Sequence, residues 1–176
     1  AGMPFDVVTL DNERGRITKL LQNNGYYKFN KDFIVYQADT VRNTFQVNLT
    51  MKLLPFQLRK EDTPTKHRQY TLRNVNILAE DNLVNPENYD SGHESISHKG
   101  LNIYYRDNIF LSPNTLATFN QLRPNELYNE QDVQNTYTSM GRFRALKYTN
   151  IRFDEIMEND SAKLDANILL TKGKNQ

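Results

Sequence analysis

A pattern that runs from a helix end through a glycine and aromatic residues into two strands occurs twice in this chain. The first copy is centred on Gly25 and the second on Gly141. Glycine suits the left-handed position just past a helix, where a side chain with a Cβ is penalised. Two copies of one supersecondary unit are the simplest explanation, because apolar residues then alternate at spacings that agree to within one residue. These are Val47, Leu49, Met51 and Leu53 after the first glycine, and Leu164, Ala166, Ile168 and Leu170 after the second.

The size and charge of the chain limit what it can be. A repeat within 176 residues favours two domains of roughly 80 residues or fewer, each with a small core. The 22 basic and 21 acidic side chains are scattered, so no cationic block predicts nucleic-acid binding. No cysteine is present, which excludes disulfides, zinc–cysteine sites and thiol catalysis. The chain opens in mid-pattern at Ala1, so we expect it to be a piece of a longer protein.

The pattern of the first half predicts one helix followed by a hairpin. Apolar side chains share one face of a helix over residues 5–24. Residues 33–36 and 44–54 predict two strands, and the alternation in the second strand predicts one buried face. This unit lacks an opening strand, so we expect residues 1–56 to be a truncated domain. The charged, proline-containing segment 57–68 is then a linker.

The second half, residues 69–176, contains the signals of a complete domain. An opening strand is predicted over residues 70–78. The polar stretch 79–99 is interpreted as an inserted loop, and a loop of that length is usually functional or mobile. Ser112 and Asn129 can cap two helices, and two further strands follow the second helix. The whole indicates an α+β fold.

No motif supports an enzyme. The one metal-like cluster contains His93 and His98, which are five residues apart, whereas the helical zinc motif needs a spacing of four. A solvated loop is the preferred interpretation, and a metal enzyme at these histidines ranks third among the alternatives. Glu155, Glu158 and Asp160 fall at a turn between strands, where carboxylates are usually solvated. We therefore expect no catalysis, no cofactor and no metal.

Sheet edges are the remaining source of function. An edge offers unpaired N–H and C=O groups that an extended partner chain can satisfy with little demand on its sequence. The 10 tyrosines and 9 phenylalanines are not matched by a basic groove, so we interpret them as packing between helix and sheet. The chain is therefore expected to be a binding module that does not bind nucleic acid.

Short motifs in both halves resemble those of the POTRA domain, the polypeptide-transport-associated module of outer-membrane assembly and translocation proteins. They lie at the approach to the second helix, at the helix exits and in the last strand: Gly2–Phe5, Arg123–Tyr128, Asn24–Tyr27, Met140–Phe143 and Leu164–Lys174. The likeness is greatest to BamA- or TamA-like surface-antigen proteins of Bacteroidetes-type bacteria. It implies tandem β-α-α-β-β units, each a mixed three-stranded sheet with two helices on one face, the first unit being truncated.

The resemblance also implies a function and its site. POTRA modules lie on the periplasmic side of the outer membrane of Gram-negative bacteria and precede a membrane β-barrel. They receive unfolded outer-membrane proteins or accessory assembly subunits. The second strand of each module lies at a sheet edge, where β-augmentation takes place. Carried over to this chain, the partner-binding residues are Phe33, Ile34, Val35, Tyr36 and Gln37, then Tyr148, Thr149, Asn150, Ile151 and Arg152, with Lys19 and Gln134 beside the groove and Gly25 and Gly141 as structural turns.

An alternative from another functional class stays open. In it, the chain is a soluble periplasmic docking module for a fixed partner protein, with loop 79–99 as the contact. Deleting that loop separates the two hypotheses. A docking module would lose its partner, whereas a strand-adding module would keep its unfolded clients.

Overall fold

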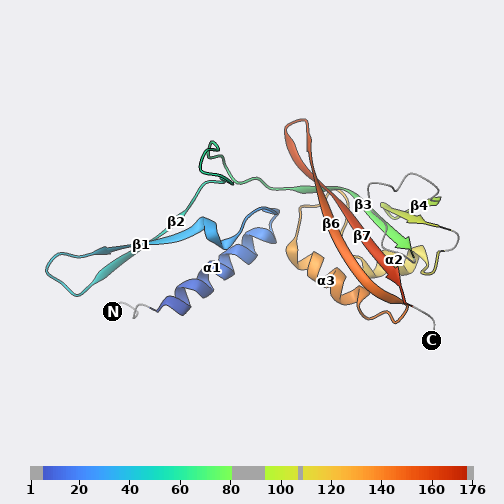
Figure 1. Cartoon of the computed structure of the whole chain (residues 1–176), viewed down its shortest axis with the longest axis horizontal. Coiled ribbons are helices and arrows are strands. Elements are labelled where there is room, and N and C mark those ends of the chain that lie inside the picture. The colour runs from blue at the N-terminus through green and yellow to red at the C-terminus, as the bar shows by residue number, and fades with distance from the viewer. Residues whose placement is uncertain (1–5, 81–93, 107–108, 174–176) are drawn as a thin grey trace.

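A computed structural model of the chain describes residues 6–80, 94–106 and 109–173. Its helices and strands form two groups that lie next to one another along the longest axis of the molecule (Figure 1). We call the elements before residue 54 the first unit and those from residue 71 onward the second unit. A connecting segment, residues 54–70, joins them.

The second unit is built on a mixed sheet of five strands in the order β4-β5-β3-β7-β6. The central strand β3 (Thr71–Glu80) is parallel to β5 (Leu101–Tyr105) on one side and to β7 (Ser161–Lys172) on the other. The antiparallel strands β4 (Glu94–His98) and β6 (Leu146–Glu158) form the two edges. The predicted α+β fold with a mixed sheet is confirmed.

The sheet has five strands rather than the three predicted, because part of the expected loop 79–99 is a hairpin. Lys99 and Gly100 have φ angles of 50° and 79°. Two consecutive residues with positive φ form the tight turn that joins antiparallel strands. The hairpin is anchored by Leu101 and Ile103, which are fully buried in the core. The loop prediction is therefore wrong over β4, whose polar sequence hides its pairing with β5.

Two helices, α2 (Pro113–Phe119) and α3 (Glu130–Met140), complete the second unit. The predicted caps are confirmed, since Ser112 Oγ and Asn129 Oδ1 each accept a backbone N–H of the first helical turn, at 3.2 and 2.9 Å. The helices and β7 share one core cluster, in which alternate residues of the strand are buried. Its members include Leu116, Val133, Met140, Leu164, Ala166, Ile168 and Leu170.

The first unit contains one long helix and a hairpin. The helix α1 (Val7–Gln22) is followed by the short 3₁₀ turn η1 (Lys31–Phe33) and by the antiparallel strands β1 (Ile34–Thr40) and β2 (Val47–Leu53). The helix and the two strands are where the sequence predicted them. None of the residues of α1 is buried, however.

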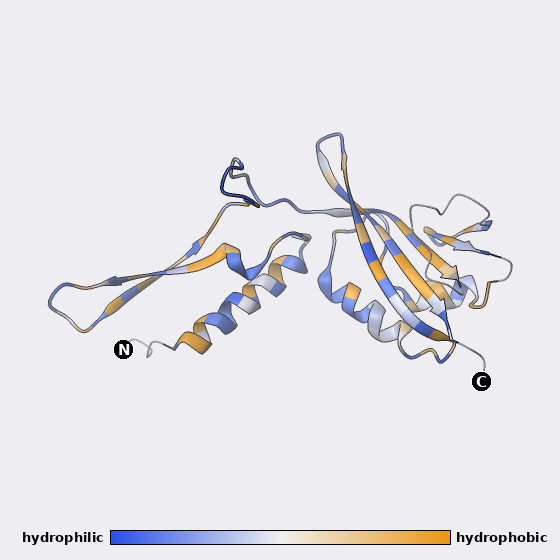
Figure 2. Ribbon diagram, in the orientation of Figure 1, coloured by the Kyte–Doolittle hydropathy of each residue, from blue (hydrophilic) through white to orange (hydrophobic). Residues whose placement is uncertain are grey.

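The apolar face of β2 is exposed, so the prediction of a buried face on this hairpin is wrong. Its alternating side chains Val47, Leu49, Met51 and Leu53 are 38–59% exposed, whereas the matching side chains of β7 are at most 2% exposed. The reason is that β7 lies between β3 and β6 in the sheet and shares its core with side chains of α2 and α3, whereas β2 pairs only with β1 and no described helix covers its apolar face. Hydrophobic segments consequently lie open along the first hairpin (Figure 2).

The two glycines of the repeat have different conformations. Gly25 has a φ of 96° and is the left-handed residue expected after α1. Gly141 has a φ of −64°, so its expected left-handed conformation is wrong. After α3 the chain continues through right-handed turns, in which the N–H groups of Arg142 and Phe143 bond to carbonyls three residues back. A left-handed residue is therefore not needed there.

Polar side chains fix the register of the sheet. Asn102 donates to Asn76 at 3.1 Å, Asn76 donates to Asn167 at 2.9 Å, and Asn167 donates to Asp154 at 2.9 Å. The row crosses four strands, from β5 to β6. A slip of one residue would break every link, because neighbouring side chains point to opposite faces of a sheet.

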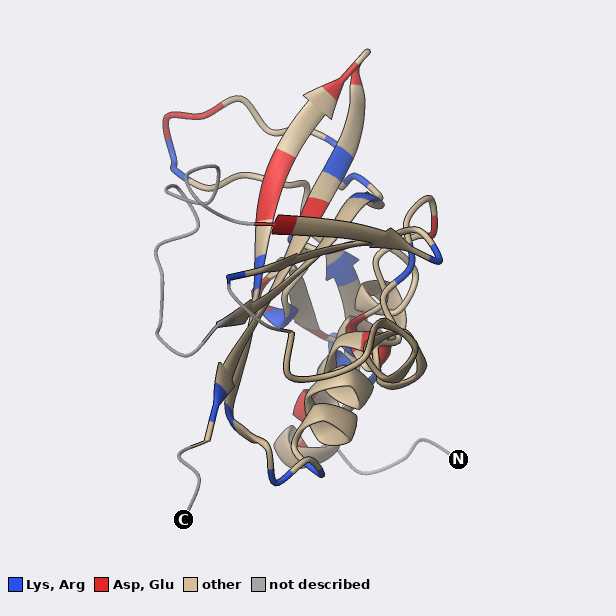
Figure 3. Ribbon diagram, turned by 90° about the vertical axis from the view of Figure 1, so that its right-hand side faces the viewer, with Lys and Arg blue, Asp and Glu red and all other residues tan. Residues whose placement is uncertain are grey.

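The β-bulge of β3 is stabilised by an ion pair between Arg73 in the bulge and Asp165 of the neighbouring strand β7. Asp165 is one of several acidic residues along the β6–β7 hairpin (Figure 3). It accepts hydrogen bonds from Arg73 at 2.8 and 3.0 Å and from the Asn74 N–H at 3.1 Å. Burial alone would raise the pKa of Asp165, but these hydrogen bonds outweigh it and hold the pKa below its ordinary value.

Candidate functional site

The backbone groups of the edge strand β6 point in two alternating directions. In an antiparallel ladder, every second residue bonds to the partner strand and the others point away from it. β6 pairs with β7 in unbroken register from Tyr148 to Glu158. The Ile151 N–H donates to the Tyr137 hydroxyl at 2.9 Å, so it points away from β7. By alternation, the same direction holds for the backbone groups of Thr149, Phe153, Glu155 and Met157.

The outward backbone groups in the second half of β6 have no hydrogen-bond partner in the part of the chain that the structure describes. Within the described residues, no hydrogen bond reaches the outward backbone N–H or C=O of Phe153, Glu155 or Met157. These positions span roughly 14 Å of strand, at about 3.4 Å per residue. An extended chain can add a strand along this stretch.

The edge strand of the first unit has the same arrangement. The Val41 N–H bonds to the Gln46 C=O across the hairpin, so odd-numbered residues of β1 bond to β2 and even-numbered residues point outward. Ile34 points outward, but its C=O accepts from Arg14 Nε at 2.9 Å and its N–H bonds to the Lys31 C=O. The outward groups beyond it belong to Tyr36, Ala38 and Thr40.

Both predicted partner-binding segments lie at edge strands, but a helix side chain occupies one position in each. Arg14 of α1 bonds to Ile34, and Tyr137 of α3 bonds to Ile151. The longer free stretch of each edge therefore lies further toward the hairpin tip. Partner binding at these segments stays a prediction. Of the predicted residues, Phe33 lies in η1, Ile34 and Ile151 are buried, Val35, Tyr36, Thr149 and Asn150 are half-buried, and Gln37, Tyr148, Arg152, Lys19 and Gln134 are exposed.

An aromatic cluster joins the two units. The Tyr27 ring of the first unit lies 5.0 Å from the ring of Tyr128 and 5.6 Å from the ring of Phe153, both in the second unit, and 5.6 Å from the ring of Tyr70 at the end of the connecting segment. The contacts are edge-on or tilted, which aromatic pairs prefer. Burial raises the pKa of the three tyrosines above its ordinary value, so they stay neutral at physiological pH.

Hydrogen bonds fix the same junction. The Tyr70 N–H donates to the Gly25 C=O at 2.8 Å. Asn23 Oδ1 accepts from the Gln131 N–H at 2.9 Å, which makes a residue of the first unit a second cap for helix α3. Two hydrogen bonds donated by main-chain N–H groups therefore stabilise the junction in addition to the ring contacts.

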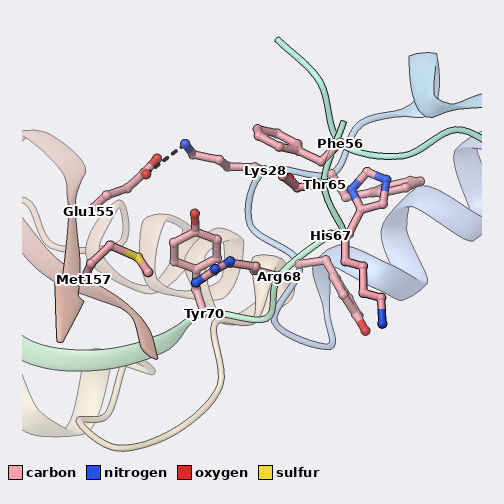
Figure 4. Close-up of a pocket in the computed structure, with 11 residues that line it drawn as sticks. Lys28, Phe56, Thr65, His67, Arg68, Tyr70, Glu155 and Met157 are labelled. Atoms are coloured by element: carbon pink, nitrogen blue, oxygen red, sulfur yellow. Dashed lines mark ion pairs between the residues drawn. The ribbon is translucent and has the colours of Figure 1, made fainter. Parts of the chain in front are cut away.

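A cleft of about 230 Å³ lies beside this junction (Figure 4). Glu155 and Met157 of β6 form one side, and Lys28 and Phe56 face them from the other. Lys28 Nζ lies 2.8 Å from Glu155 and 5.6 Å from the centre of the Phe56 ring. The hydrogen bond with Glu155 raises the pKa of Lys28. The ion pair therefore bridges the cleft and links the two units.

The segment predicted as a linker is folded against the first unit and forms the third wall of this cleft. Phe56 and Thr65 pair as an antiparallel bridge. His67 Nε2 lies 2.7 Å from the Leu54 C=O, and the His67 ring packs edge-on against Phe33 at 4.7 Å. The stretch 65–68 is thereby held in place, with Lys66 and Arg68 on the cleft.

The architecture has counterparts among solved structures. BamA from Haemophilus ducreyi, in a crystal structure lacking POTRA domains 1-3, matches 98% of this chain with a TM-score of 0.61 and 12% identity. The chain has a POTRA-type fold. POTRA domains 1-3 of Omp85 from Anabaena match 98% of the chain with a TM-score of 0.44 and 14% identity. The chain covers 24% of the BamA chain and 54% of the Omp85 chain, and at these identities the likeness concerns the fold alone. No protein-family model and no curated protein matches the sequence.

Sequence reasoning missed the residues that join the two units. Tyr27 was interpreted as general packing, and Asn23, which directly precedes the helix-exit motif, was given no role. Their partners Tyr128 and Gln131 lie more than a hundred residues away in the chain. The doubled aromatic Tyr26-Tyr27 directly after Gly25 is the one sequence signal that could have indicated a contact at this turn.

The described residues contain neither a metal-binding cluster nor a membrane-spanning helix. No group of three or more metal-ligating side chains gathers anywhere in the described parts of the chain. Of the two histidines considered above, His93 lies outside the described residues, and His98 Nε2 is 2.8 Å from Asn114 Oδ1. Among the described helices, none has the length and apolar character needed to span a membrane.

Proposed function

We propose that the protein is a non-catalytic scaffold on the periplasmic side of the bacterial outer membrane, and that it holds extended polypeptide along the free edge of β6. The fold supports this setting, since it matches part of a BamA crystal structure. The observation that carries the site is the row of outward backbone groups at Phe153, Glu155 and Met157, to which no described residue makes a hydrogen bond. The clients are unfolded outer-membrane proteins or accessory assembly subunits on their way to assembly or translocation.

Backbone pairing alone makes this a weak and general binder. Three outward residues offer up to six hydrogen bonds, each contributing about 0.5–1.5 kcal/mol net. The cost of association, about 4–15 kcal/mol, offsets most of that gain. A weak edge suits a scaffold that must accept many sequences and release them.

We also propose a division into two domains and a type of bacterial protein. Residues 1–56 and 69–176 form two successive POTRA-like domains, which the two separate sheets support. The motifs at Asn24–Tyr27 and Met140–Phe143 support a BamA- or TamA-like surface-antigen protein of a Bacteroidetes-type bacterium.

A proline at Met157 tests the edge. Proline removes the outward N–H, which no described residue uses, so the fold should tolerate it at an edge strand. We expect Met157→Pro to weaken capture of a urea-denatured outer-membrane β-barrel protein at least fivefold in a pull-down titration, roughly the effect of one lost backbone bond. The matched variant Met157→Ala keeps the N–H and should bind within about twofold of wild type. Equal binding by the proline variant, with an unchanged circular dichroism spectrum, would contradict the proposal.

A further inference from the structure

The cleft between the two units lies where the side chains of a chain paired with β6 would fall. Side chains on one face of β6 alternate with those on the other. Ile151 and Phe153 point to the face that carries the core, and Glu155 and Met157 follow them on that face and line the cleft. A strand added to the edge would place its own alternate side chains on the same face. Figure 1 shows β6 on the side of the sheet that faces the first unit.

The size of the cleft fits side chains better than a cofactor. Small-molecule sites usually enclose about 300–1,000 Å³, and this cleft measures about 230 Å³. It is open at its mouth and bounded by the folded segment 65–68, by Lys28 and by β6. One or two side chains of an extended chain can occupy it.

The charge of the cleft favours an acidic group. The described lining contains three cations, Lys28, Lys66 and Arg68, against the single carboxylate of Glu155. Glu155 is engaged by Lys28 at 2.8 Å, and Arg68 has a longer contact of 3.7 Å with the exposed Asp160. No carboxylate in the described part of the chain pairs with Lys66.

The remaining lining favours an aromatic or large apolar neighbour. Phe29, Phe56, Tyr70 and Met157 supply ring faces and edges and a thioether around the cationic mouth. Lys28 already lies over the Phe56 ring, so the cations and the apolar wall are adjacent. Since side chains on one face of a strand come from positions i and i+2, an acidic and an aromatic residue two apart would both reach the cleft.

We infer that the cleft selects among the chains that pair with β6, and that it takes an extended polypeptide segment with an acidic residue two positions from an aromatic one. This inference rests on the proposed function. The cleft would give β6 a sequence preference, because backbone hydrogen bonds along an edge discriminate little between different peptide sequences. The junction contacts of Tyr27 and Asn23 keep the two walls of the cleft at a fixed spacing.

Labelled ten-residue peptides of alternating threonine and valine test the inference by fluorescence anisotropy. One series carries Glu-x-Phe, a second Lys-x-Phe and a third Glu-x-Ser. The full chain should bind the Glu-x-Phe peptide at least about fivefold more tightly than either of the others, in line with a partly exposed ion pair and an aromatic contact. Lys66→Glu should remove the preference for Glu over Lys. Lys60→Glu makes the same charge change in the connecting segment outside the cleft and should leave the preference intact.

The outcomes separate the cleft from the edge. Equal affinity for the three peptides, with binding still lost in Met157→Pro, overturns the cleft and leaves the proposed function standing. If Met157→Pro binds the peptides as wild type does, edge pairing is overturned. If Lys66→Glu then still removes the preference for the Glu-x-Phe peptide, the ligand class inferred for the cleft is supported. A preference lost equally in Lys60→Glu and Lys66→Glu overturns the cleft as its source, because net charge then explains it.

Discussion

Truncating Tyr27 to alanine should loosen the junction between the two units. The ring contacts Tyr70, Tyr128 and Phe153 at centroid distances of 5.0–5.6 Å. Aromatic pairs contribute about 0.5–1.5 kcal/mol each beyond their buried area, so three pairs amount to roughly 3 kcal/mol. Tyr27→Ala should therefore lower the free energy of unfolding by about 3 kcal/mol. At about 2–4 °C per kcal/mol for a chain of this length, the melting temperature should fall by roughly 6–12 °C.

Urea denaturation followed by near- and far-ultraviolet circular dichroism measures this change. Tyr27→Phe is the matched control, because it keeps the ring and removes a hydroxyl that donates to no described group, and it should unfold within about 0.5 kcal/mol of wild type. Phe45→Ala controls for loss of an aromatic ring at a fully exposed site. If Tyr27→Ala costs less than about 1 kcal/mol, the ring cluster does not hold the units together and the reasoning is refuted.

Three further predictions concern the two glycines of the repeat, two matching strand positions and the acid sensitivity of the fold. Gly25→Ala should cost about 1–2 kcal/mol in urea denaturation, because its φ is 96°, whereas Gly141→Ala, at −64°, should cost less than about 1 kcal/mol; equal costs would contradict the assigned conformations. Met51→Lys should change stability by less than about 0.5 kcal/mol, whereas Ile168→Lys, at the matching buried position, should prevent folding, as judged by circular dichroism. Asp165→Asn should remove part of the acid sensitivity. The lowered folded-state pKa of Asp165 gives stability that is present above the unfolded pKa near 3.8 and is lost as pH falls through the folded value. Unfolding curves between pH 2 and pH 6 that stay parallel in variant and wild type would count against this assignment.

Local signals in the sequence predicted the secondary structure well. The caps at Ser112 and Asn129, the helix before Gly25 and the strands after it depend on neighbouring residues, and all are confirmed. The hairpin around Lys99 and Gly100 was missed because its turn is short and its first strand is polar. Only pairing with the buried strand β5 makes that strand recognisable.

The burial of β2 and the candidate site could not be predicted in the same way. The alternation of Leu49 with its neighbours shows that one face of the strand is apolar, but whether that face is covered depends on other elements. The occupation of the edge at Ile34 and Ile151 depends on Arg14 and Tyr137, which lie 20 and 14 residues away. The cleft requires the two units to meet, and that geometry results from contacts over more than a hundred residues.

The open first hairpin also has a consequence for motion. Two paired strands with an exposed face are marginally stable alone in water. Opening of β1 and β2 from their tip should therefore require far less free energy than opening of β3 and β7, which are buried in the centre of the larger sheet. Amide hydrogen exchange should divide the chain accordingly, with protection falling from Ile34 toward Thr40. A chain that binds to β2 should then be detectable because it slows the exchange of the weakly protected amides of this hairpin.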